Sequence, residues 1–382
     1  MITTLGTRAP GAPGELALES PIERIAVFRA CPLGELLCAV PALRALRHGY
    51  PEAEITLIGL PQGRALSQRL PCIDRFIEFP GYPGLADLPC DVRALPDFLA
   101  QVQAQRFDLA LQLHDGGLVA NPLVASFGAR HTAGFVAANA WRPEVDALWY
   151  APWPGYGAEI ERLLTLTDRL GLARRGSALE FPLREQDRAE LAALWPGLGE
   201  HLRQGRPYVC VHAGAHLPSR RWPLERFAAV ADRIAESGRT VVLTGDALEV
   251  ARVDQVAALM RHEAVKLAGR TGLWTLGALI EGAEQVVCND TSLSHIAAAL
   301  RRPSVVISWR RCGALGTAGR RAPCRAVAAD GLPTVCACGV PGRAWMCRGG
   351  CGGRRGEGVA ARPVTNTPRP GPRLRFEMRG SR

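Results

Sequence analysis

Four consecutive polar residues, Asn289-Asp290-Thr291-Ser292, precede a helix-like run of small residues that contains His295. A helix N-terminus presents unpaired N–H groups and a positive dipole end, which suit a phosphate. Helix capping accounts for one of the four polar residues, so we interpret Thr291 and Ser292 as hydrogen-bond donors to a phosphate. Asp290 would repel a phosphate, and we predict that it binds sugar hydroxyls or orients the loop. His295, on the first turn, is more typical of a packed residue than of a catalyst.

A second loop, which follows the apolar run at 208–212, offers further donors for a diphosphate. Gly214 and Ala215 are small enough to let the backbone approach an anion. Arg220 and Arg221 carry forked guanidinium groups that bind phosphate oxygens in pairs. Two solvated surface arginines are the alternative interpretation of the same pair.

Two glutamates, Glu35 and Glu249, follow predicted strands at places where an acid can have a catalytic or binding role. Glu35 lies in the first turn of a helix that follows a tight loop at Gly34. It would act as a general base if an acceptor hydroxyl came within hydrogen-bond reach, or it would simply compensate the helix dipole. Glu249 follows the strand that ends at Gly245, a place where dinucleotide-binding folds hold an acid for ribose hydroxyls.

Short apolar runs alternate with segments of helical periodicity, which predicts parallel sheets covered on both faces. Predicted strands are at 24–30, 54–60, 75–79, 107–113, 208–214, 240–245, 285–289 and 304–308. Predicted helices are at 35–49, 92–106, 159–172, 225–238, 249–260, 273–283 and 292–300. The fold class is therefore α/β, with two doubly wound, Rossmann-like domains that face a cleft.

Composition divides the chain into five regions. We predict a disordered N-terminus, a first Rossmann-like domain, a linker, a second Rossmann-like domain and an atypical tail, at 1–22, 23–172, 173–206, 207–309 and 310–382. The tail is rich in Arg, Gly and Cys, and we expect it to be disordered or the product of a shifted reading frame. The single lysine of the chain, Lys266, supports a GC-rich gene in which such a shift yields this composition. Resequencing near codon 309 tests that hypothesis.

Charge and motifs exclude several classes of function. The net charge is +10, but residues 310–382 contribute +12, so the remainder carries about −2 and offers no basic groove for nucleic acid. A Walker loop, a G-x-G-x-x-G fingerprint and a G-x-S-x-G elbow are all missing from the sequence, which disfavours ATPases, nicotinamide enzymes and serine hydrolases. Tail cysteines (Cys336, Cys338, Cys347 and Cys351) are too loosely spaced to favour zinc, and we predict no metal and no cofactor.

Four stretches together resemble glycosyltransferase family 9, the ADP-heptose:lipopolysaccharide heptosyltransferases. They are VFRACPLGELLCAVPALRALRHGYPEAEITLIG, HAGAHLPSRRWPLERFAAVADRI, VVLTG with the later Glu249, and NDTSLSHIAAALRRPSVVI. The resemblance covers about residues 24 to 308. It implies the GT-B architecture and an inverting, metal-independent transfer of a heptose from a nucleotide donor.

The resemblance also assigns roles to individual residues. It implies that Glu35 is the base, that Arg220 contacts the donor phosphates and that Glu249 contacts the ribose. The donor site would also include Asp290, Thr291 and Ser292. Three positions depart from the family pattern, which has Asp, Lys and Gly where this chain has Glu35, Arg220 and Ser292.

The resemblance implies partners and a location as well. The partners are ADP-heptose as the donor and a lipid-linked glycan as the acceptor. The location is the cytoplasm, with peripheral contact at the inner membrane. A nucleotide-sugar-binding protein with little or no transferase activity is the alternative function.

Overall fold

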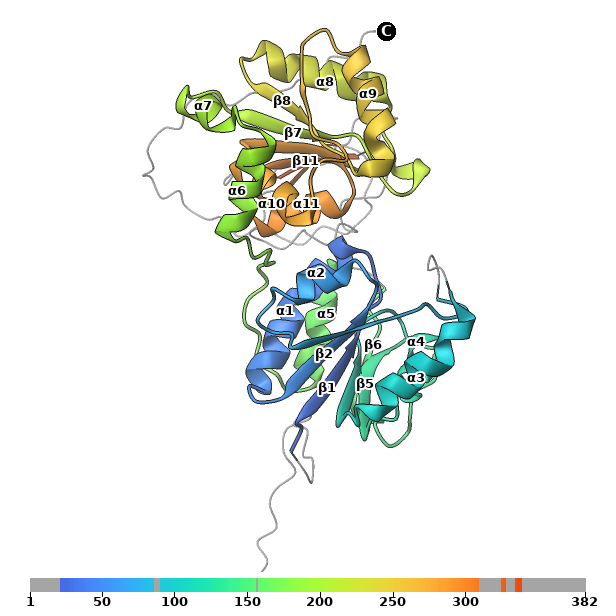
Figure 1. Cartoon of the computed structure of the whole chain (residues 1–382). Coiled ribbons are helices and arrows are strands. Elements are labelled where there is room, and N and C mark those ends of the chain that lie inside the picture. Colours follow the sequence, from blue (N-terminus) through green and yellow to red (C-terminus); the bar gives the residue numbers. More distant parts are fainter. Residues whose placement is uncertain (1–20, 86–89, 156, 309–323, 328–333, 339–382) are drawn as a thin grey trace, which may run out of the picture. The chain divides into compact units, whose positions relative to one another are not determined.

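The computed structural model describes residues 21–85, 90–155, 157–308, 324–327 and 334–338. Residues 1–20 of the predicted disordered N-terminus and most of the 310–382 tail therefore lie outside the described residues. Two sheets form the framework of one compact unit (Figure 1). The α/β class predicted from the alternation of apolar runs is confirmed.

The first sheet has six parallel strands in the order β3-β2-β1-β4-β5-β6. The strands are β1 (Arg24–Phe28), β2 (Glu54–Gly59), β3 (Arg75–Glu78), β4 (Leu109–Gln112), β5 (His131–Val136) and β6 (Tyr150–Pro152). The helical elements are α1 (Leu33–Gly49), α2 (Gly63–Ser67), η1 (Val92–Ala94), α3 (Leu95–Ala104), α4 (Ala120–Ala125), η2 (Ala147–Trp149) and α5 (Glu159–Arg169). This strand order is that of the Rossmann fold.

Helices cover both faces of the first sheet, because successive side chains of each strand point to opposite faces. Ile25 and Val27 of β1 join the cluster that contains side chains of α1 and α5. Ala26 and Phe28 join a second cluster with side chains of α3 and α4. Figure 1 shows α1, α2 and α5 on one side of the sheet and α3 and α4 on the other.

The second sheet has the order β12-β13-β11-β10-β7-β8-β9, in which β13 runs antiparallel to both of its neighbours, β11 and β12. Its strands are β7 (Tyr208–His212), β8 (Thr240–Leu243), β9 (Val265–Lys266), β10 (Gln285–Asn289), β11 (Ser304–Ser308), β12 (Cys324–Val327) and β13 (Thr334–Cys338). Its helical elements are α6 (Glu185–Leu194), α7 (Leu198–Arg203), η3 (Pro218–Arg220), α8 (Leu224–Glu236), η4 (Ala247–Glu249), α9 (Val250–Leu259), α10 (Leu273–Gly282) and α11 (Ser292–Ala299). Its parallel part repeats the Rossmann order.

Two predicted regions differ from the structure. The segment 173–206, predicted to be a linker, contains α6 and α7, and Arg188 of α6 forms a two-fold hydrogen-bonded ion pair with Glu281 of α10. Within the tail predicted to be disordered, 324–327 and 334–338 are strands that extend the second sheet. Edge pairing to β11 requires only backbone groups, so the unusual composition of the tail did not reveal it.

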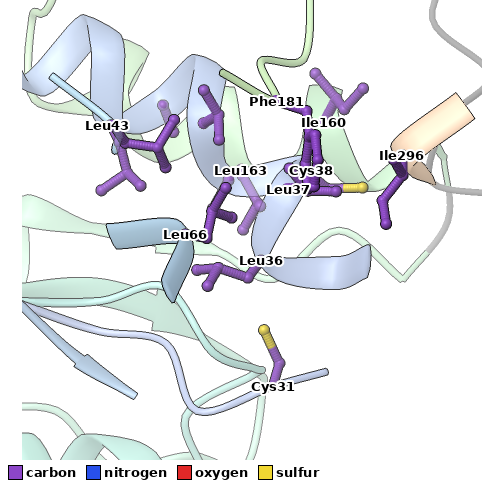
Figure 2. Close-up of a cluster of buried hydrophobic side chains, with 14 of the residues drawn as sticks. Cys31, Leu36, Leu37, Cys38, Leu43, Leu66, Ile160, Leu163, Phe181 and Ile296 are labelled. Carbon is purple, nitrogen blue, oxygen red and sulfur yellow. The ribbon is translucent and has the colours of Figure 1, made fainter. Parts of the chain in front are cut away.

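One hydrophobic cluster includes side chains from helices of both sheets. Figure 2 shows Leu37 and Cys38 of α1 near Ile160 of α5 and Ile296 of α11. These side chains are almost completely buried. The contact between α1 and α11 matters for function, because both helices begin at the loops that the sequence singled out.

Candidate active site

Both sheets have a topological switch point, where ligands bind in open α/β folds. In the first sheet it lies between β1 and β4, and in the second between β7 and β10. The short loop after β1 leads into α1, which carries Glu35 in its first turn. The loops that carry Gly214 to Arg221 and Asp290 to Ser292 follow β7 and β10. The predicted site loops therefore flank the two switch points.

Asn289, at the end of β10, fixes the loop after β7. Its side chain accepts a hydrogen bond from the Trp222 N–H at 3.1 Å and donates to the carbonyls of Ala213 and Gly214 at 3.0 Å each. The residue is completely buried. The sequence pattern places Asn289 in a capping signal, but its amide holds a neighbouring loop instead of capping α11.

Replacing Asn289 with alanine should destabilise the part of the fold built on the second sheet, because two carbonyls and one N–H group would lose their partner in a buried place. The expected cost is on the order of 3 kcal/mol, which corresponds to a Tm lower by roughly 5–10 °C. Thermal unfolding followed by circular dichroism measures the change. Asn139→Ala, at an exposed position, is the matched control. An unchanged Tm in Asn289→Ala would show that the loop does not need this clamp.

The N-terminal turns of α1 and α11 are in direct contact. The Gly34 N–H donates to the Ser292 Oγ at 3.2 Å. A Cβ atom on Gly34 would lie 2.6 Å from the His295 ring and 3.1 Å from the Ser292 Cα, so glycine is required for this approach. Glu35 follows directly in the chain and its side chain is exposed. The predicted base and the predicted phosphate site therefore adjoin.

The capping interpretation of the α11 start is wrong in detail. Thr291 is the N-cap residue, but its side chain accepts no capping hydrogen bond, and its Oγ1 is buried without a partner among the described residues. Its carbonyl accepts the Ser294 N–H and hydroxyl. The Ser292 hydroxyl faces Gly34. Side chains thus leave the first N–H groups of α11 available for a ligand.

His295 packs between the two helices. Its Nδ1 lies 3.4 Å from the Sγ of Cys38 in α1. Burial lowers the pKa of His295 to about 4, although the nearby carboxylates of Asp290 and Glu159 oppose this effect and Arg220 adds to it. The imidazole is therefore neutral at neutral pH, which suits a packed residue better than a cationic phosphate ligand.

The two predicted arginines have different environments. Arg221 donates from Nε to the Ala215 carbonyl at 2.8 Å, which folds the loop back on itself. Arg220 is half-buried in η3 and affects the pKa of His295. Within the described ranges, no hydrogen bond or ion pair engages the Arg220 guanidinium. Arg220 is thus the arginine available to an anion at the start of α11.

Glu249 lies against the loop after β7. A Cβ atom on Gly214 would lie 1.8 Å from the Glu249 Oε1, so this contact requires glycine. The carboxylate also accepts the Asp246 N–H at 3.1 Å and lies 3.6 Å from the His212 Nε2. Burial lowers the pKa of His212, so the imidazole is neutral at neutral pH and its contact with Glu249 is not an ion pair. A hollow of about 360 Å³ opens here, lined by Ala215, His216, Arg221, Asp246, Leu248, Glu249, Ala251, Arg252 and Gln255.

Arg29 is a functional candidate that sequence analysis missed. It is almost completely buried at the end of β1 and donates to the Glu35 carbonyl at 3.0 Å. It also forms an ion pair with Glu159 of α5 at 2.9 Å and hydrogen-bonds the carbonyls of Leu113 and His114. Its position directly after the apolar run of β1 was the available signal, since a charged residue is rarely buried at such a place.

The structure thus gathers most of the predicted residues into two adjoining places. Gly34, the neighbour of Glu35, contacts Ser292 and His295 where α1 and α11 begin, and the charges of Arg220 and Asp290 act on His295. Ala215, Arg221 and Glu249 line the hollow, with Gly214 beside Glu249. Among the described residues, no cluster of three or more His, Cys, Asp or Glu side chains could hold a metal ion. The tail cysteines weighed as zinc ligands lie outside the side chains that the structure describes.

Two Rossmann-like sheets with such loops at both switch points are the arrangement of the GT-B fold. The family model described as "Glycosyltransferase family 9 (heptosyltransferase)" matches residues 97–307. The chain belongs to glycosyltransferase family 9, and it is therefore an enzyme of the class that the resemblance implied.

Individual relatives agree with this assignment. The chain is 28% identical to lipopolysaccharide heptosyltransferase 2 of Escherichia coli K12, over 74% of this chain and 82% of that protein. It is 25% identical to lipopolysaccharide heptosyltransferase 3 of the same strain, over 71% of this chain and 78% of that protein.

Solved structures share the fold. The family 9 glycosyltransferase of Veillonella parvula has a TM-score of 0.63 at 21% identity, with 76% of this chain and 82% of that chain covered. The E. coli ADP-heptose lipopolysaccharide heptosyltransferase II has a TM-score of 0.59 at 22% identity, with 78% and 88% covered. The GT-B fold predicted from the sequence is confirmed.

Proposed function

We propose that this enzyme transfers a heptose from ADP-heptose to the core oligosaccharide of lipopolysaccharide, with inversion at the anomeric carbon and without a metal ion. The observation that carries the proposal is the hydrogen bond from the Gly34 N–H to Ser292. It joins the helix that presents an exposed carboxylate to the helix whose N-terminus suits a phosphate. Family membership and the heptosyltransferase relatives support the sugar and the acceptor.

The chemistry follows from these positions. The Glu35 carboxylate takes the proton of an acceptor hydroxyl, and the resulting oxygen attacks the anomeric carbon opposite the diphosphate. The bond to the diphosphate oxygen breaks, and a single displacement inverts the configuration. Arg220 and the first N–H groups of α11 stabilise the charge that develops on the leaving ADP.

The hollow beside Glu249 would hold the nucleoside of the donor. Glu249 accepts the ribose hydroxyl hydrogen bonds, while Asp290 contacts sugar hydroxyls or orients its loop. Thr291 adds a buried hydroxyl without a partner in the described ranges, which a phosphate oxygen would satisfy. Arg221 supports the loop through its bond to Ala215.

The proposal implies a lipid-linked acceptor and a site of action at the cytoplasmic face of the inner membrane. No helix in the described part of the chain is long and apolar enough to cross a bilayer. Contact with the membrane would therefore be peripheral for this part of the chain.

A transfer assay with purified protein tests the proposed function. The protein is incubated with deacylated, truncated core oligosaccharide and, in separate reactions, ADP-heptose, ADP-glucose and UDP-glucose, with and without EDTA. We expect transfer from ADP-heptose, unchanged by EDTA, and a product whose anomeric configuration by NMR is opposite to that of the donor. A requirement for metal or a retained configuration would overturn the mechanism. Donor binding without any transfer would instead favour a nucleotide-sugar-binding protein.

A further inference from the structure

His114 occupies the other side of the first switch point from Glu35. It lies two residues after the end of β4, and β4 pairs with β1, whose following loop leads to Glu35. The ring is half-buried and lies beside Phe28, with 5.4 Å between the ring centroids. Loops on the two sides of a switch point line the same ligand site.

The Arg29 side chain holds the backbones of Glu35 and His114. The two terminal nitrogens of the Arg29 guanidinium donate to the Glu35 carbonyl at 3.0 Å and to the His114 carbonyl at 3.3 Å. Because this guanidinium is almost completely buried and paired with Glu159, it fixes the two backbones relative to each other. A substrate group that reaches Glu35 is therefore close to residue 114.

The imidazole of His114 has unused hydrogen-bonding capacity. Its Nδ1 is buried and has no partner in the described part of the chain. Buried polar atoms in native proteins are nearly always hydrogen-bonded, so an unpartnered one at a ligand site suggests a ligand. Burial lowers the pKa of His114 to about 4, although Asp115 opposes this effect. The ring is therefore neutral at neutral pH, with one nitrogen that donates and one that accepts.

We propose that His114 binds a hydroxyl group of the acceptor sugar and so positions the acceptor for proton removal by Glu35. This inference rests on the proposed function and adds an acceptor-binding residue from β4. A hydroxyl group both donates and accepts, so it fits either tautomer of the imidazole. The Phe28 contact and the Arg29 hydrogen bond orient the residue before the acceptor arrives, which reduces the entropic cost of binding.

Kinetics on His114 variants test the inference. His114→Phe keeps the ring packing against Phe28 but removes both nitrogens, and His114→Asn keeps one donor and one acceptor. We expect the acceptor KM of His114→Phe to rise roughly ten- to a hundredfold with a smaller change in kcat, as for the loss of a buried hydrogen bond. His114→Asn should recover part of the loss. His48→Phe, at the exposed opposite end of α1, is the matched control.

Two further measurements separate acceptor binding from a structural role. The Kd for ADP and the Tm of His114→Phe should stay near the wild-type values. A wild-type acceptor KM in His114→Phe would overturn the inference, and so would equal losses in acceptor and ADP binding.

Calorimetry without turnover separates this inference from the proposed function. Deacylated, truncated core oligosaccharide is titrated into wild-type protein and His114→Phe in the presence of ADP. Binding that depends on His114 in a protein that transfers no sugar would refute the proposed function and leave this inference standing. Transfer by a protein whose oligosaccharide binding does not depend on His114 would refute the inference alone.

Discussion

Glu35→Gln should lower kcat for sugar transfer by roughly 10²- to 10⁴-fold, the usual contribution of a general base, while the Kd for ADP changes little. The amide has nearly the size of the carboxylate but cannot accept the hydroxyl proton. The Glu35 side chain is exposed, and among the described residues its carboxylate takes part in no hydrogen bond or ion pair, so the fold should be unaffected. Initial rates and calorimetry with ADP measure the two quantities.

Two control variants sharpen this result. Glu52→Gln removes an exposed carboxylate in the turn after α1 and should have wild-type activity. Glu35→Asp shortens the side chain by one methylene and restores the acid typical of the family, so it should stay within about tenfold of wild type. Full activity in Glu35→Gln would place the base elsewhere and would leave dipole compensation as the role of Glu35.

Arg220→Ala should weaken ADP binding and lower kcat by roughly 10²- to 10³-fold, the range seen when one group that stabilises a developing negative charge is removed. The reason is that the Arg220 guanidinium has no protein partner in the described ranges and lies close enough to α11 to affect His295. Its Tm should remain near that of the wild type, because no described hydrogen bond of the fold is lost. Donor titrations and thermal unfolding measure these quantities.

The neighbouring arginine is the matched control for Arg220. Arg221→Ala removes the hydrogen bond to the Ala215 carbonyl and should therefore lower the Tm. Any loss of sugar transfer in this variant would result from disorder of the loop. The two variants should therefore separate into a ligand-binding defect and a stability defect. Equal Tm losses in both variants, with similar rates, would contradict the assignment of Arg220 to the diphosphate.

Local patterns predicted the long, periodic elements well. The helix predicted at 273–283 is α10 (Leu273–Gly282), and the strand predicted at 285–289 is β10 (Gln285–Asn289). Both elements show a clear pattern of apolar residues, because β10 is buried on both faces and α10 packs one face against the core. Strands β5, β6 and β9 were not predicted. β6 and β9 are only three and two residues long, and β5 mixes polar residues and glycine with apolar ones, so none of the three carries a clear period.

Close contacts in the candidate site were predictable at two glycines. Gly34 and Gly214 signalled close contacts, and the structure shows what each contact is, namely His295 and Glu249. Asn289 and Arg29 were not recognised, because their partners are 67 to 76 and up to 130 residues away along the chain. Hydrogen-bond partners at such separations leave no trace in local spacing.

By itself, the sequence determined the α/β class, the order of the elements, the family and the loops that hold polar residues, since these follow from periodicity and from glycine and charge at strand ends. Only the tertiary structure decided which side chains of those loops remain available to bind a ligand. Arg220 and Arg221 are adjacent in the chain, yet one lacks a described partner and the other ties its own loop. A side chain's availability depends on which distant backbone groups compete for it, and folding alone brings those groups within reach.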